Sequence, residues 1–180
     1  IRYTILIMNK EKQKLKQNSK QKPKQKQFSK RKPKKAKSNR VSEHFSKRDF
    51  VCKESGEFKI SLGLVGALEQ LRFLTKKRIT IIKGYEPPEV AEKKGKIKRN
   101  YHTKGIAADI QVDNLDPKEA FIFAETIPEI NGIGLNIAEN YIHVDTRKEE
   151  RTLWIEEKDS IIELNEENRS KYLDAPQSSE

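Results

Sequence analysis

The chain is poor in several residue types, and each shortage excludes a class of protein. It has one cysteine, one methionine, one tryptophan and three histidines among 180 residues. A single cysteine, Cys52, cannot form an intramolecular disulfide and cannot build a zinc site from several thiolates. Any bound metal must therefore be held by imidazole and carboxylate groups.

Long apolar runs are also missing. The apolar run at residues 5–8 is shorter than a signal-peptide core of about 7–15 residues and far shorter than a membrane span of about 20. Its last residue, Met8, is the only methionine and would be a natural start. We expect a soluble protein without a recognisable export signal, which stays inside the cell, leaves when the cell lyses, or has lost its leader.

Positive charge is concentrated in one segment. Residues 9–40 hold 15 lysines or arginines and one acid, a net charge of +14, so with Arg2 counted residues 41–180 sum to −4. Too few apolar side chains are present there to offset the entropy cost of ordering the segment. We predict a disordered basic tail over residues 1–40. It either binds a polyanion such as nucleic acid, lipid headgroups or wall polymer, or is a solvated extension without a partner.

The rest of the sequence alternates between helical and strand patterns. Apolar residues three and four apart predict a helix over 61–75, and Asp116 followed by Pro117 predicts the start of a second helix. Strands are predicted at 79–82, 106–112 and 141–145, with a further apolar segment at 153–155. The first strand is β-branched throughout and is expected to be buried.

This order of elements predicts an α+β domain over residues 41–156. We expect a small, mostly antiparallel sheet with two main helices, since no repeated strand–helix–strand spacing is present. Residues 157–180 are acidic and lose strong periodicity, which predicts a loosely structured C-terminal extension.

Two of the three histidines lie in sequences typical of a metal site. His102 and Asp109 are seven residues apart around small residues, and His143 and Asp145 alternate, so that they share one face of a strand. A catalytic zinc takes three protein ligands from donors of this kind. We interpret His102, Asp109 and His143 as zinc ligands on the sheet. The alternative is a surface His102, a partly buried His143 and a structural Asp109.

Two other features carry less weight. His44 lies between Glu43 and Phe45 and is interpreted as a surface or capping residue. Gly132 and Gly134 lack the third glycine and the lysine of a phosphate-binding loop, so they indicate a tight entry to a strand pair with closely packed backbones.

The same residues match the signatures of a known family. Residues 102–109 fit the H-x-x-G-x-A-x-D signature of the zinc D-alanyl-D-alanine carboxypeptidase family, and residues 141–147 resemble its second signature, H-x-D followed by Thr-Arg. Supporting segments occur in family order: residues 45–52, Gly84-Tyr85, residues 132–134 and Trp154. The resemblance covers roughly residues 42–155.

The resemblance implies that His102, Asp109 and His143 bind Zn²⁺. It further implies hydrolysis of amide bonds in peptidoglycan stem peptides, of the D,D-carboxypeptidase or endopeptidase type. The protein would then be cytoplasmic before its release to the cell wall.

Candidate catalytic and substrate-binding residues follow from the same comparison. Asp145 is the first choice for the general base or for a partner that orients a ligand, and Glu139 is the reserve. A substrate carboxylate would be held by a cation, for which Arg147, Lys83 and Arg99 are candidates.

Three positions depart from the family pattern. Asn140 stands where several branches have an acid three residues before the last histidine, Glu86 where relatives have arginine, and Asn100 where they often have serine. The alternatives are therefore an inactive zinc-binding module, as in the hedgehog signalling domain, and a polyanion-binding protein that acts through residues 9–40.

Overall fold

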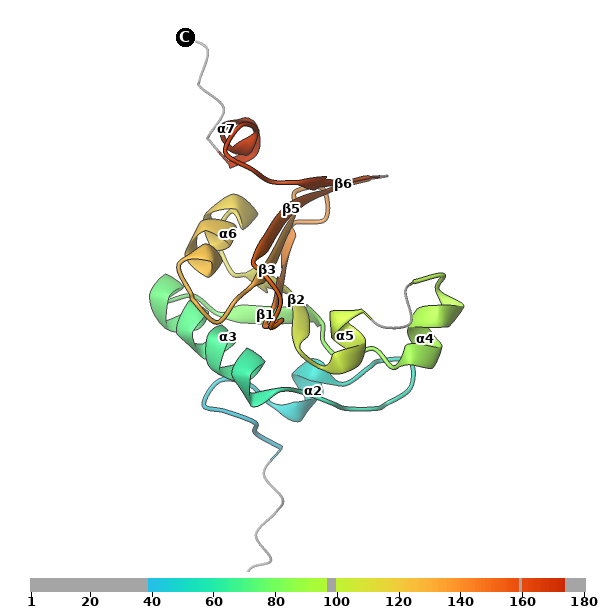
Figure 1. Ribbon diagram of the computed structural model, residues 1–180. Helices are drawn as coiled ribbons and strands as arrows, with labels where there is room; N and C mark the ends of the chain where they lie inside the picture. Colours follow the sequence, from blue (N-terminus) through green and yellow to red (C-terminus); the bar gives the residue numbers. More distant parts are fainter. Residues whose placement is uncertain (1–38, 97–99, 159, 174–180) are drawn as a thin grey trace, which may run out of the picture. The chain divides into compact units, whose positions relative to one another are not determined.

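The computed structural model describes residues 39–96, 100–158 and 160–173 (Figure 1). Nearly all of the predicted basic tail, with Arg99 and residues 174–180, lies outside the described residues. Among the described helices, none has the length and apolar character needed to cross a bilayer.

A six-stranded sheet organises the described residues. Its strands follow the order β1-β2-β4-β3-β5-β6, and every neighbouring pair is antiparallel except β3 and β5, which run parallel. The strands are β1 (Ile79–Lys83), β2 (Ala107–Val112), β3 (Gly132–Asn136), β4 (Tyr141–Asp145), β5 (Thr152–Glu157) and β6 (Ser160–Glu163). The predicted α+β class with a mostly antiparallel sheet is confirmed.

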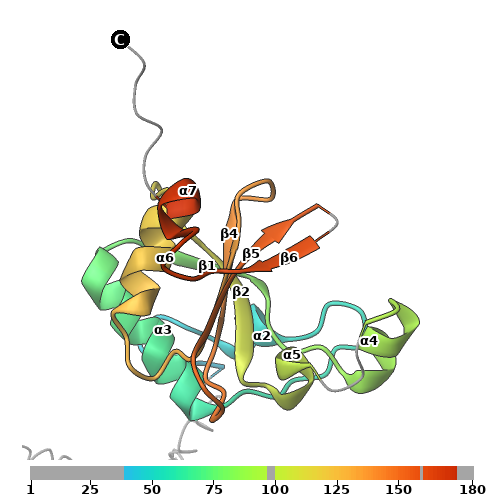
Figure 2. The same ribbon diagram turned by 45° about the horizontal axis from the view of Figure 1, so that its top comes forward.

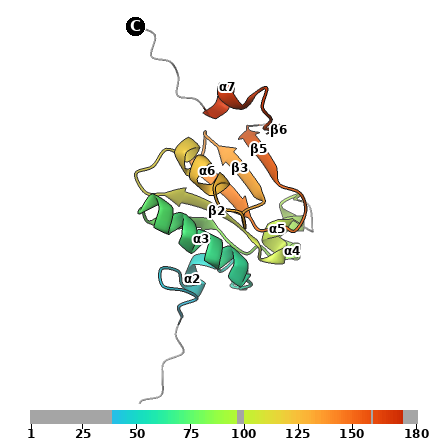
Figure 3. The ribbon, with the colours of Figure 1, turned by 60° about the vertical axis from the view of Figure 1, so that its left-hand side comes forward.

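The two longest described helices cover one face of this sheet. Helix α3 (Leu62–Thr75) begins where the Ser61 side chain accepts a hydrogen bond from the Gly63 N–H, and α6 (Pro117–Glu125) begins where Asp116 accepts one from Lys118. Figures 2 and 3 show both helices on the same side of the strands. The apolar core lies between them and the sheet, and its fully buried side chains include Leu64, Leu68, Leu71, Phe121, Ile110, Ile133, Leu135 and Ile142.

Shorter helices carry the connections. Helix α2 (Lys47–Phe50) anchors the start of the domain through the buried Phe50. Helices α4 (Pro88–Lys93) and α5 (Tyr101–Lys104) lie on the side of the strands opposite α3 and α6 (Figure 2). This second face of the sheet is left free of the main helices and carries the polar side chains of β2, β4 and β5.

Strand β1 differs from the prediction of a buried strand. It is an edge strand with solvent on one face, so only Ile79 is buried and Ile82 is 37% exposed. The pairing with β2 shifts between Ile81 and Lys83, which brings Lys83 opposite Asp109. A bulge of this kind re-aims a side chain, and here it turns Lys83 to the polar face.

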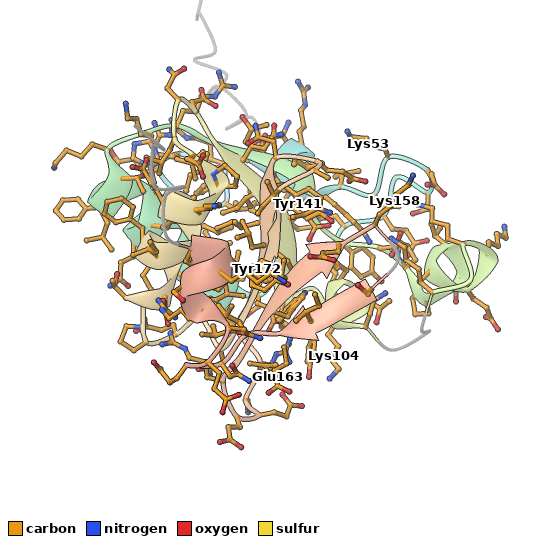
Figure 4. All side chains as sticks on the ribbon, turned by 90° about the horizontal axis from the view of Figure 1, so that it is seen from above. Lys53, Lys104, Tyr141, Lys158, Glu163 and Tyr172 are labelled. Carbon is orange, nitrogen blue, oxygen red and sulfur yellow. The ribbon has the colours of Figure 1, made fainter. Side chains whose placement is uncertain are left out.

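Residues 157–158 and 160–173 also differ from the expectation of loose structure. Strand β6 pairs with β5, and α7 (Arg169–Leu173) buries Tyr172 and Leu173 in the core. Figure 4 shows α7 with Tyr172 beside the hairpin that ends at Glu163. Arg169 also binds Glu125 of α6 at 2.6 Å. The sequence of this segment is acidic overall, but a few of its apolar residues, Leu164, Tyr172 and Leu173, are buried in the core.

Candidate metal centre

Three side chains from three elements meet on the polar face of the sheet. Asp109 in β2 and His143 in β4 are direct cross-strand partners, and His102 comes from α5 just before β2. One donor atom from each lies within 4.8 Å of the others. The structure therefore brings together the three residues that the sequence predicted as ligands.

The backbone before β2 sets the position of His102. Helix α5 is a single turn, capped at its start by the Asn100 side chain and ended by Gly105 with φ of 73°. A Cβ at Gly105 would lie 2.9 Å from the Lys59 carbonyl oxygen, so glycine is required both by conformation and by space. Asn100, which replaces the serine of relatives, thus has a structural role as the helix cap.

A backbone carbonyl fixes the tautomer of His102. Its Nδ1 lies 2.8 Å from the Gly84 carbonyl oxygen, which can only accept, so Nδ1 carries the proton and donates it. The other nitrogen, Nε2, then faces Asp109 Oδ1 at 3.2 Å with its lone pair free for a metal. Gly84 makes this approach possible, since a Cβ there would lie 2.6 Å from Phe50 Cα.

His143 is held between two carboxylates. Its Nδ1 lies 2.8 Å from Asp109 Oδ1 and its Nε2 lies 3.2 Å from Asp145 Oδ2. Burial alone would lower the pKa of His143, but the hydrogen bonds to Asp109 and Asp145 raise it to about 9. Without metal, His143 is therefore protonated at neutral pH and donates to both carboxylates.

The two carboxylates are kept ionised by their partners. Burial would raise the pKa of Asp109, yet the facing imidazoles of His102 and His143 hold this pKa well below its usual range. Burial would likewise raise the pKa of Asp145, and hydrogen bonds from Arg147 and His143 lower it to about 2. Both groups are negative at any physiological pH, which is the state that a metal requires.

This donor set fits a zinc ion. Imidazole nitrogen and carboxylate oxygen are its common ligands, and a ligating histidine usually donates its other N–H to a carbonyl or carboxylate. His102 has Gly84 in that role, and His143 has Asp145. The fit therefore extends from the three candidate ligands to the groups that orient them.

The candidate ligands open onto a cavity of about 770 Å³. Its lining comes from α5 and the loop before it, from β1, β2, β4, β5 and β6, and from the segment after β4. The residues are Lys83, Gly95, Lys96, Asn100, Tyr101, His102, Asp109, Tyr141, His143, Arg147, Thr152, Trp154, Glu156, Ile161 and Glu163. A ligand or substrate would reach the metal from this side.

Asp145 lies behind His143 rather than in the cavity. It is fully buried, and it accepts from Arg147 Nε at 2.8 Å and Arg147 Nη2 at 2.5 Å as well as from His143. Arg147 itself lines the cavity with its guanidinium 4.2 Å from the centre of the Tyr101 ring. The geometry places Asp145 where it orients His143 and Arg147.

Glu139 is not brought to the cluster. It is an exposed residue of the β3–β4 turn, and its backbone N–H donates to the Asn136 side chain at 2.9 Å. Asn140, in the same turn, adopts φ of 55° and borders a separate, small hollow beside Ile142. Neither position faces the candidate ligands.

Glu86 has a different role from the arginine of relatives. It is 2% exposed, lies outside the cavity lining, and forms ion pairs with Lys83 at 2.9 Å and Lys94 at 3.1 Å. The contact with Lys83 is a charge contact without hydrogen-bond alignment. Glu86 therefore holds the ammonium group of Lys83, which lines the cavity.

His44, the third histidine, lies away from the cluster. Its Nδ1 is 2.6 Å from Glu69 Oε2, and its backbone N–H donates to Glu69 Oε1. The interpretation of His44 as a surface residue holds.

Sequence reasoning missed the part of the cavity formed by Tyr141, Trp154 and Glu156. Tyr141 precedes His143 by two residues and shares its face, so strand alternation was a usable signal. Glu156 stands two after Trp154 in the same way, but its acidic neighbourhood suggested a solvated segment.

The two glycines of β3 accommodate side chains and not backbones, which corrects the prediction. A Cβ at Gly134 would lie 2.5 Å from the Trp154 ring, and one at Gly132 would collide with Asp145. The missing side chains leave room for the indole on one side and the buried carboxylate on the other.

Comparison with protein families gives one result. The model of the family described as Peptidase M15 matches residues 40–145, which include all three candidate ligands. A search of curated proteins gives no match.

Proposed function

The chain belongs to the peptidase M15 family of metal-dependent peptidases, and on that premise we propose that it is a zinc-dependent hydrolase of peptidoglycan stem peptides. The reaction would be of the D,D-carboxypeptidase or endopeptidase type. The observation that carries the proposal is the cluster of His102, Asp109 and His143 at an open cavity.

The candidate ligands define what the metal would do. Bound by His102 Nε2, Asp109 and His143 Nδ1, zinc would supply a water of lowered pKa and polarise the scissile carbonyl. The protein fixes both imidazoles through Gly84 and Asp145, so no reorganisation is needed when substrate arrives.

Cations in the cavity support a substrate with a carboxylate. Lys83 stands next to the cluster, opposite Asp109 in the sheet, and Glu86 holds it there. Lys96 lines the same side, and its pKa is lowered by burial and by the neighbouring Lys83. We assign Lys83 to the substrate carboxylate, with Arg147 as the second cation.

Asp145 acts in this scheme as the residue that orients His143. Its two oxygens are already occupied by Arg147 and His143, which leaves it poorly placed to take a proton from water. This observation favours a second candidate function, a zinc-binding module without peptidase activity, because Glu139 and Asn140 also face away from the cavity.

Metal analysis and peptide digestion separate the two functions. Purified protein should contain one equivalent of zinc, and His102→Ala should lose it. His44→Ala is the matched control, because the His44 ring binds Glu69 away from the cluster and its loss should leave the zinc content unchanged.

Digestion of muropeptides, followed by mass spectrometry, tests catalysis. Release of a C-terminal residue or cleavage of a cross-link that a chelator abolishes supports the peptidase. Full zinc occupancy without cleavage of any stem peptide supports the inactive module, and a lack of zinc in the wild-type protein contradicts both.

A further inference from the structure

The far wall of the cavity is formed by residues that follow the family match. The match ends at residue 145, whereas Trp154 and Glu156 come from β5 and Ile161 from β6. Tyr141 of β4 completes this wall. The wall therefore combines one residue inside the matched range with three beyond it.

Trp154 connects the wall to the candidate metal ligands. The register aligns His143, Gly134 and Trp154 across β4, β3 and β5. Because Gly134 has no side chain, the indole lies over it, with its ring centre 5.2 Å from that of His143. Anything bound at the metal and extending toward β5 would therefore pass along this indole.

Glu156 lies beyond the indole and binds only neutral donors. It accepts hydrogen bonds from Tyr141 Oη at 2.6 Å and from Trp154 Nε1 at 3.1 Å, with Asn136 Nδ2 further away at 3.5 Å. Among the described residues, no lysine or arginine forms an ion pair with it. The buried carboxylates Asp145 and Glu86 do have cationic partners: Arg147 pairs with Asp145, and two lysines pair with Glu86.

Tyr141 contributes its phenol to this wall, where Oη donates a hydrogen bond to Glu156 Oε2 at 2.6 Å. Glu163 adds a second carboxylate to the same wall from β6. The wall thus carries two carboxylates, while Lys83 and Lys96 line the other side of the cavity and Arg147, paired with Asp145, lies over the Trp154 ring.

We propose that Glu156, flanked by Tyr141 and Trp154, binds an ammonium group of the peptide substrate and so selects which peptides are cut. The inference rests on the proposed function. A carboxylate forms a short, charge-assisted hydrogen bond with an alkylammonium ion, and aromatic faces attract the same ion. Binding would supply the missing countercharge.

The sheet sets the distance from the scissile bond. Strands β4 and β5 are two spacings apart, roughly 10 Å, which about three extended residues or one residue with a long basic side chain would span. The ammonium is therefore either a side-chain amine close to the scissile bond or the amino terminus of a short peptide.

Trp154 provides the measurement, because it is the only tryptophan in the chain. Its emission would be titrated in the zinc-loaded protein with a lysine-containing tripeptide in three forms: unmodified, acetylated on the side-chain amine, and acetylated on the amino terminus. We expect saturable changes in emission and at least tenfold weaker binding when the recognised amine is acetylated. The form that weakens identifies the source of the ammonium.

Variants assign the effect to Glu156. Glu156→Gln removes the charge and should bind all three forms as weakly as the wild type binds the acetylated one. Glu129→Gln is the control, since it removes an equal charge from an exposed turn outside the cavity lining. Equal binding of all three forms by the wild type, or an amine preference that persists in Glu156→Gln, would overturn the inference.

The binding test does not depend on catalysis. An amine preference without cleavage contradicts the peptidase and leaves the subsite standing. Cleavage at rates that are unaffected by acetylation supports the peptidase and contradicts the ammonium subsite. Where cleavage occurs, Glu156→Gln should lower kcat/KM at least tenfold for the peptide with the free amine and leave the acetylated peptide unchanged.

Discussion

Replacement of Asp145 by asparagine distinguishes an orienting residue from a general base. Asp145 is fully buried and accepts hydrogen bonds from Arg147 and His143. Asparagine keeps the size of the side chain but removes its charge and turns one acceptor into a donor. The change therefore affects the orientation of His143 and leaves the residues that line the cavity in place.

The structure sets the size of the effect. Loss of the partner that orients a ligating histidine typically weakens metal binding 10–100-fold, which is about 1.4–2.7 kcal/mol. The full loss of zinc affinity should appear above pH 9, where His143 is deprotonated in both proteins. At pH 7 the loss should be smaller. Asp145 helps to raise the pKa of His143 to about 9, so Asp145→Asn lowers this pKa and protons then compete less with zinc for His143.

A second effect concerns the metal-free protein. Removal of one partner of a buried ion pair costs about 3–5 kcal/mol when the other charge stays buried. Arg147 is 12% exposed and keeps its contacts with Tyr101 and Trp154, so we expect the lower end of this range. Thermal unfolding after chelation would measure it.

Zinc affinity would be measured by competition with a chromophoric chelator, at pH 7 and pH 9.5. Asp113→Asn is the matched control, since Asp113 is exposed and its carboxylate accepts a long, weak hydrogen bond of 3.5 Å from Thr80 Oγ1. Unchanged zinc affinity in Asp145→Asn would refute the orienting role. If peptide cleavage then fell 10²–10⁴-fold at saturating zinc, Asp145 would be the general base instead.

Three further outcomes are expected. Zinc must displace a proton from His143, so its apparent affinity should rise about tenfold per pH unit up to about pH 9, with release of nearly one proton at pH 7 in calorimetry. Chelation should lower the melting temperature, zinc should restore it, and His102→Ala should abolish the zinc-dependent part, which is about 4 kcal/mol at a thousandfold excess over Kd. Gly134→Ala should displace Trp154, shift its emission and cost about 1–3 kcal/mol, whereas Gly66→Ala, with nothing within 4 Å of the added carbon, should be neutral or stabilising. An unshifted emission in Gly134→Ala would contradict the packing described.

The sequence was sufficient where one element determines the outcome. Periodicity and capping residues predicted the helices that became α3 and α6, and alternation placed His143 and Asp145 on one face. The family signatures then joined His102 and Asp109 to that strand. These features depend on residues close together in the chain, which is why patterns of spacing reveal them.

Features that depend on distant partners were not predictable in this way. Strand alternation would place Lys83 on the same face as Ile79 and Ile81. Only the shifted pairing with β2 turns Lys83 toward the cavity. Gly134 must lack a side chain because the Trp154 ring lies over it. Trp154 is twenty residues later in the chain and reaches Gly134 through the parallel pairing of β3 with β5. Glu156 follows the predicted apolar segment 153–155 and begins a run of acids, and only the pairing of β5 with β3 places it beside Trp154 at the cavity.

The charges of the cluster explain why the cavity should impose one direction on its substrate. Without metal, Asp109 and Asp145 are balanced by protonated His143 and Arg147, so the buried groups are neutral as a set. Zinc adds two charges and displaces one proton, which leaves the set with a net charge of +1.

This added positive charge lies between the two ends of the cavity. On the side of β1, Lys83 adds a further positive charge, and on the side of β5, Glu156 places a negative charge. A substrate that has a carboxylate at one end and an ammonium at the other is stabilised in one orientation and repelled in the reverse one. The preference for one orientation is the difference between these two arrangements, so the attraction in the first and the repulsion in the second both contribute to it.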